Sequence, residues 1–257
     1  MRIAYNELLG DRVATFDEVC AVPLPEKTKT YEPVPNKMFV ELIKNKVENK
    51  LPGWDLVEEN YILAREGQRM FATIMFKHAS YASQLCWAIG NSYDKSMSAR
   101  FASGSGVRCC SNTHMGGDDM VFLRKHTKHV VRDLDSRLDD ASDTAVARLL
   151  NRIKDMTAMK EREITMERGF EVLGLLRGKN ILGATEFSKA LEHWVKPPFE
   201  EFEPRNVWSL YNSGTWALHI APPHRSFEKR RDLDAVVLDL FPKQDNDVDC
   251  DSELEPA

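Results

Sequence analysis

The hydrophobic period of the chain changes near residue 132, and this change limits the folds that are open to it. Before Arg132, apolar residues gather in short runs with strand-like alternation, whereas after it they recur at every third or fourth position. The later positions form one helical stripe: Leu134, Leu138, Ala141, Ala145, Leu149, Ile153 and Met156. Because strands and helices are segregated, the sequence predicts an α+β fold with a helical C-terminal half.

The first half of the chain predicts an antiparallel β-sheet packed against helices. Two apolar runs flank the four-residue turn Arg65-Glu66-Gly67-Gln68, which is typical of a hairpin. Leu85, Trp87 and Ile89 alternate in a third strand, whereas the Gly/Ser run 102–106 is expected to bend the chain as it enters a strand at Val107. The strands are expected over 54–64, 69–77, 84–90, 107–111 and 120–124.

Helices are expected both before and after these strands in the sequence. Asn36 is positioned to cap a helix that ends at Leu51-Pro52-Gly53. The stripe after Arg132 requires one long helix, or two abutting helices with Ser142 or Asp143 as the second cap. Further helices are expected over 164–176, 184–194 and 205–220, with proline pairs at 197–198 and 222–223 between them.

The domain organisation follows from these patterns. Residues 1–35 contain four prolines and are expected to be an irregular lead-in, followed by a basic β-rich core over 36–132. Residues 133–242 are expected to be the helical part of the same domain. Residues 243–257 are acidic and poor in large apolar side chains, which predicts a disordered tail.

Charge is distributed unevenly along the 257 residues. The formal net charge is −5, yet residues 61–132 carry ten lysines and arginines against four acids, and residues 232–257 carry nine acids against Lys243. The sequence contains no apolar run of membrane-spanning length and no signal-peptide pattern at its start. Five cysteines in a chain of this length favour a reducing compartment. These features predict a cytoplasmic protein, in the host cytoplasm if a phage encodes it.

Motifs for catalysis and metal binding are incomplete. In Gly174-Leu-Leu-Arg-Gly178-Lys179-Asn180 the glycines are too close for a phosphate loop, and Gly178 fits the end of a helix. The metal-ligand types Cys109, Cys110, His114, His126 and His129 lack the paired spacing of a zinc site. No metal or cofactor is therefore expected, and the protein is not expected to be an enzyme. An enzyme built around Asp94, Cys110, Asp118 and His126 is an alternative function for the chain, but these residues show no recognisable catalytic geometry.

The dense basic turn between Phe122 and His129 favours binding to nucleic-acid phosphates. Single-strand binders add aromatic rings on which bases stack. The expected phosphate contacts are Arg100, Arg108, Arg124, Lys125, Lys128 and Arg132. The expected stacking residues are Tyr93, Phe101 and Phe122. A solvated basic loop is the alternative interpretation of the same residues.

Three sequence blocks resemble a known family. They are Ala88-Ile-Gly-Asn91-Ser92-Tyr-Asp94-Lys95-Ser96, then Gly104-Ser-Gly-Val-Arg108-Cys-Cys-Ser-Asn112 with Arg124-Lys-His-Thr, and finally Asn206-Val-Trp208-Ser-Leu-Tyr211-Asn212-Ser-Gly-Thr. With Pro33-Val-Pro35-Asn-Lys37 upstream, their order resembles the phage/plasmid-like proteins catalogued as domain of unknown function 932, over about residues 33–220. Cys109-Cys110-Ser111 and Thr113-His-Met-Gly-Gly117 depart from the usual pattern.

The resemblance implies a mobile-element origin, from a bacteriophage or plasmid. The order of helix, hairpin, third strand and long helix is compatible with phage single-strand annealing proteins, an analogy of fold. The expected function is therefore binding and annealing of single-stranded DNA in recombination, by an oligomer and without covalent chemistry. The acidic tail is expected to compete for the DNA groove or to dock a single-strand-binding or other replication protein. The alternative is a non-enzymatic interaction or host-takeover factor that binds a protein through the helical half.

Overall fold

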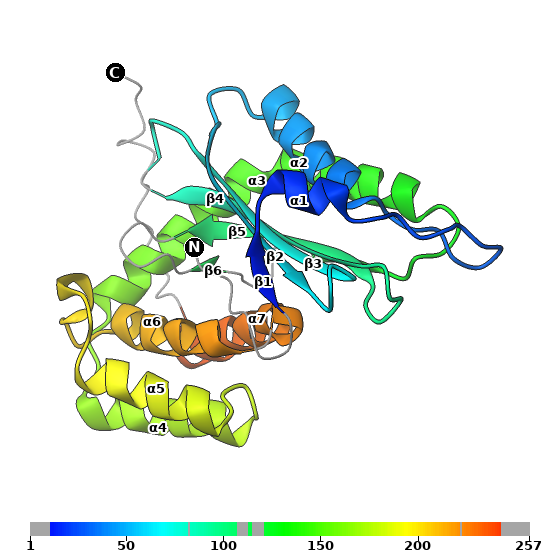
Figure 1. Cartoon of the computed structure of the whole chain (residues 1–257). Coiled ribbons are helices and arrows are strands. Elements are labelled where there is room, and N and C mark those ends of the chain that lie inside the picture. The colour runs from blue at the N-terminus through cyan, green and yellow to red at the C-terminus, as the bar shows by residue number, and fades with distance from the viewer. Residues whose placement is uncertain (1–10, 82, 107–112, 115–120, 222, 243–257) are drawn as a thin grey trace.

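A computed structural model of the chain describes residues 11–81, 83–106, 113–114, 121–221 and 223–242 (Figure 1). Within these ranges an antiparallel sheet runs in the order β1-β2-β3-β4-β5, and both β6 and β7 pair with β5. The strands are β1 (Arg12–Ala14), β2 (Asp55–Ala64), β3 (Arg69–Lys77), β4 (Gln84–Ser92), β5 (Ala99–Gly106), β6 (Thr113–His114) and β7 (Val121–Arg124). The α+β class and the antiparallel sheet predicted from the sequence are confirmed.

The hairpin and the third strand lie where the alternation predicts them. β2 pairs with β3 from Asp55↔Lys77 to Ala64↔Arg69. The turn between them places Arg65, Glu66 and Gly67 at positive φ. The expected bend at 102–106 is wrong, because this run lies in β5, where Ser103 pairs with Trp87 and Gly104 with Cys86. Small residues suit this strand because they leave room beside Trp87 in the core. The strand expected over 107–111 falls outside the described residues.

Two helices cover one face of the sheet. α2 (Asn36–Lys50) buries Phe39, Val40 and Ile43, and the stripe on α3 (Val130–Glu161) buries Leu134 and Leu138 against the strands. α3 is a single helix of 32 residues, about 48 Å long at the usual rise. Ser142 caps no second helix, since its buried hydroxyl donates to the carbonyl of Leu138 at 2.8 Å.

The remaining helices form a second core around the far end of α3 (Figure 1). Trp194, Trp208 and Tyr211 are buried there. The sequence does not predict the last helix, because the proline pair at 222–223 indicates only a break, whereas Pro223 is the first residue of that helix. The helices are α4 (Met166–Gly178), α5 (Ala184–Val195), α6 (Val207–Ala217) and α7 (Pro223–Leu240), with the 3₁₀ turns η2 (Glu200–Phe202) and η3 (Leu218–Ile220).

The N-terminal segment is more ordered than its prolines indicate. Besides β1 it contains α1 (Phe16–Ala21), which begins with a capping box between Thr15 and Glu18. Asn36 is the first residue of α2 rather than its N-cap, which is Pro35. The Asn36 side chain instead accepts a hydrogen bond from Asn91. The tail at 243–257 lies outside the described residues.

Candidate functional site

A basic surface forms where three distant segments meet at one end of α3. We define it by Lys27, Lys29, Lys95, Lys125, Lys128, His129 and Arg132, all of which are exposed. The buried side chain of Tyr31 lies against it. The ammonium group of Lys95 lies 4.6 Å from the centroid of the Tyr31 ring, and the Tyr31 and His126 rings are 5.7 Å apart. The lead-in, the β4–β5 turn and the turn before α3 therefore contribute to one site.

Glu32 holds the lead-in against the turn before α3. Its backbone N–H donates to the carbonyl of His126 at 2.9 Å, and its carboxylate accepts from the backbone N–H of His129 at 3.1 Å. The other carboxylate oxygen accepts from Lys27 at 2.6 Å. The hydrogen bonds from Lys27 and from His129 lower the pKa of Glu32. His129 itself has the left-handed backbone conformation that reverses the chain into α3.

His126 is the buried support of this turn. Its side chain is almost fully buried, and neither ring nitrogen has a hydrogen-bond partner in the described part of the chain. Burial lowers the pKa of the imidazole, which favours its neutral form. The described residues contain no group of three His, Cys, Asp or Glu side chains placed to hold a metal ion. Cys109 and Cys110 lie outside the described residues.

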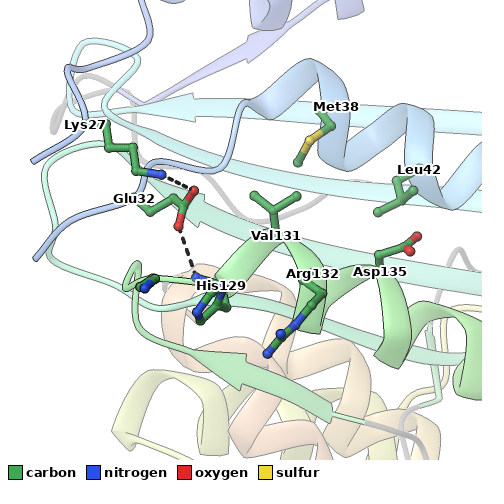
Figure 2. A pocket seen from close by; sticks show the side chains of 9 residues that line it. Lys27, Glu32, Met38, Leu42, His129, Val131, Arg132 and Asp135 are labelled. Carbon is green, nitrogen blue, oxygen red and sulfur yellow. Dashed lines mark hydrogen bonds and ion pairs between the residues drawn. The ribbon is translucent and has the colours of Figure 1, made fainter. Parts of the chain in front are cut away.

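An open groove of about 490 Å³ lies beside the basic surface, between α2 and the first turn of α3 (Figure 2). Its floor is apolar and consists of Met38 and Leu42 from α2 and Val131 from α3. Its rim is charged. The rim residues are Lys27, Glu32, Lys128, His129, Arg132 and Asp135.

The structure brings four of the expected phosphate contacts together. Arg124 ends β7, Lys125 and Lys128 lie in the turn before α3, and Arg132 lies in its first turn. Arg124 is partly buried and forms an ion pair with Asp133, which also contacts Arg132 at 3.3 Å. Lys125 and Lys128 have no carboxylate partner among the described residues, and Lys128 and Arg132 line the groove. These three exposed cations are accessible to a polyanion.

Arg100 does not belong to this surface. It alternates with the core residue Phe101 along β5, so it lies on the opposite face of the sheet. There its guanidinium group lies 6.0 Å from the centroid of the Phe71 ring and donates to the sulfur of Met97 at 3.1 Å. The side chain is 9% exposed, so the expected phosphate contact is wrong for Arg100. Arg108 lies outside the described residues.

The three expected stacking rings are buried. Phe101 is 1% exposed, Phe122 and Tyr93 are each 6% exposed, and Phe101 stacks on Phe122 at 5.6 Å. Their role as base platforms does not fit this burial. The sequence places them beside basic residues, but the pleat of the strands directs Phe101 and Phe122 into the core.

The first block of motif residues builds the site indirectly. Asn91 donates from Nδ2 to the carbonyl of Val34 and to Asn36, both at 2.7 Å, which ties β4 to the start of α2. Ser92 bonds the backbone of Met97 in the turn after β4. Asp94 pairs with Arg69 at 2.8 Å and accepts from the backbone of Ser96. These contacts shape the turn that presents Lys95, the member of this block that lies on the basic surface.

The final block, over residues 206–215, lies in the other core. Trp208, Tyr211 and Asn212 are buried on α6, and Asn212 donates to the carbonyl of Trp208 at 2.9 Å. The Tyr211 hydroxyl donates to Asp234 at 3.0 Å. These contacts assign the block to packing. Asn112 lies outside the described residues.

The sequence reasoning missed the other half of the site. Lys27, Glu32, Met38 and Leu42 come from the lead-in and from α2, far from the basic turn in the sequence. The Lys27-Thr28-Lys29 run just before Pro33 was the available signal, since it is the basic part of that segment. Nothing local indicated that it lies against residues 126–129.

Comparisons with known proteins add no assignment to this site. No helix in the described ranges is both long enough and apolar enough to cross a membrane. A comparison of the chain with protein-family models, curated proteins and solved structures finds no match. The resemblance to the phage/plasmid-like family stays a prediction from the sequence.

Proposed function

We propose that this protein binds the sugar–phosphate backbone of single-stranded DNA through the basic surface and acts in strand annealing, without covalent chemistry. The observation that carries the proposal is that Lys128 and Arg132 line the groove, that Lys95 lies over the Tyr31 ring, and that Lys125 is exposed in the same turn as Lys128. Three of these, Lys95, Lys125 and Lys128, have no carboxylate partner among the described residues. A partner that supplies a row of phosphates matches this arrangement.

The burial of the aromatic rings favours annealing over simple protection of a strand. A protein that stacks bases on its own rings must release them before they pair. Contacts to phosphates alone leave most base edges available to a complementary strand. Because Tyr93, Phe101 and Phe122 are buried, the basic surface is expected to hold the strand chiefly through its phosphates.

The first test is fluorescence anisotropy of a labelled single-stranded oligonucleotide at low and at physiological salt, with a duplex as the comparison. Each phosphate contact on a single strand contributes about 0.7 to the slope of log affinity against log salt. The double variant Lys125→Glu/Lys128→Glu should therefore bind more weakly and with a slope flatter by about 1.4. This loss should be similar for all base sequences.

Lys154→Glu/Lys179→Glu is the matched control. Both of these lysines are exposed away from the basic surface, Lys154 on the far half of α3 and Lys179 at the C-cap of α4, and they give the same change in net charge. The control should retain the wild-type slope. An unchanged slope in the Lys125/Lys128 variant, or equal losses in both variants, would remove the basic surface from the proposal.

A further inference from the structure

We infer that the groove between α2 and α3 receives one unstacked base of the bound strand, an inference that rests on the proposed function. The basic surface accounts for phosphates but leaves the adjoining groove without a ligand. Its volume of about 490 Å³ lies within the range of about 300–1,000 Å³ that is usual for small-molecule sites.

The floor of the groove suits a flat apolar ring and not a phosphate. Met38, Leu42 and Val131 are partly buried and packed on the core beneath, so they form a fixed surface. Phosphate oxygens would lose hydration there without a donor in return. A base would bury one face, and the Met38 thioether makes favourable contacts with aromatic rings.

Two carboxylates on the rim support the same occupant. Glu32 and Asp135 can accept hydrogen bonds from the N–H groups on the edge of a base, which a phosphate does not offer. Glu32 is fixed by Lys27 and by the backbone of His129. Asp135 pairs with Lys46 at 2.9 Å and remains about half exposed. Two hydrogen-bond acceptors beside an apolar floor complement a base.

The cations on the rim connect the groove to the strand. Lys128 lies just before α3 and Arg132 in its first turn, and both line the groove. A backbone whose phosphates contact these side chains passes along the edge of the groove, so one base can turn into it. One base held per protein chain would fix the position of the strand while its neighbours stay free to pair.

The test fills the groove with a larger side chain and compares the affinity of the protein for two kinds of strand. Wild-type protein and Leu42→Trp are titrated with a labelled oligonucleotide and with a strand of the same length that lacks bases. Wild type should prefer the base-containing strand by about tenfold, the scale of one base contact. Leu42→Trp should lose that preference, while its affinity for the abasic strand and its salt slope stay at wild-type values. Leu175→Trp, at an exposed position on α4, is the matched control and should change neither.

A second variant covers the case in which Leu42→Trp does not fold. Met38→Ser makes the floor polar without adding volume and should also reduce the preference for bases. Equal weakening on both strands would overturn the inference, because it would show damage to the basic surface alone. Full retention of the preference in both variants would also overturn it and leave the proposed function standing. If wild type binds neither strand, the proposed function fails, and the inference fails with it.

Discussion

At the scale of single residues, the pleat of the strands decides which side chains are available for binding. Along β7, Phe122 is 6% exposed while its neighbour Leu123 is 61% exposed. Along β5, Phe101 points into the core and Arg100 away from it. Neighbours in the sequence therefore have opposite environments, which explains why the expected stacking rings and Arg100 were assigned wrongly.

The burial of His126 leads to a prediction about how the stability of the fold depends on pH. Burial lowers its pKa in the folded protein from the usual 6.5, so the unfolded chain takes up a proton first as the pH falls. Stability should therefore decline as the pH falls below about 6.5. His126→Phe should remove this contribution. The decrease in the free energy of unfolding between about pH 7.5 and about pH 5.5 should then be smaller by up to about 1.4 kcal/mol than in wild type.

The measurement is urea unfolding at both pH values, for wild type and variant. His193→Phe serves as the comparison, because burial also lowers the pKa of that half-buried histidine. An identical pH dependence in wild type and His126→Phe would show that His126 can be protonated in the fold.

At the scale of elements, local pattern predicted the hairpin and the helices α2 to α6, but neither α1 nor α7. The stripe on α3, the turn between β2 and β3, and the positions of α4 and α5 follow from spacing that neighbouring residues supply. β1 and β5 were missed. β1 has three residues, and β5 contains serines and glycines whose strand conformation depends on pairing with β4 and β6.

The packing of α4 against α5 gives a prediction with an internal control. A Cβ added at Gly169 would lie 2.2 Å from the indole of Trp194, whereas one added at Gly174 would meet nothing within 4 Å. Gly174→Ala should stabilise the protein by up to about 1 kcal/mol, because alanine favours helix. Gly169→Ala should destabilise it by about 1–3 kcal/mol, since the buried indole must shift.

Urea unfolding of the two variants checks this pair. Equal stabilisation by both would mean that Trp194 does not pack on Gly169 as described. The comparison isolates helix packing, because both glycines lie on the same helix and undergo the same substitution.

At the scale of the whole molecule, α3 belongs to both cores. Its first half packs on the sheet, and its end, at Met159, packs among the C-terminal helices. Between them, Arg152 pairs with Asp234 of α7 at 2.8 Å, and Tyr211 of α6 donates to the same carboxylate oxygen. Asp234 is fully buried, and burial raises its pKa. This polar contact fixes α6 and α7 on α3.

Removing one partner of this pair should cost more than removing both. Arg152→Met should lower the free energy of unfolding by about 3–5 kcal/mol, because it leaves the Asp234 carboxylate buried without its cation. Arg152→Met/Asp234→Leu should recover part of that loss. Urea unfolding of the double variant and of both single variants, Arg152→Met and Asp234→Leu, measures these losses. If the double variant loses as much unfolding free energy as the two single variants together, the two side chains do not stabilise each other.

The sequence by itself determined the fold class, the hairpin, the long helix and the basic turn, because each depends on the spacing of neighbouring residues. Only the tertiary structure decided the site. Lys27, Lys95 and Lys128 meet because the lead-in, the β4–β5 turn and the start of α3 converge around Tyr31. These contacts join segments up to about a hundred residues apart, through burial and hydrogen bonds that leave no periodic signal in the sequence.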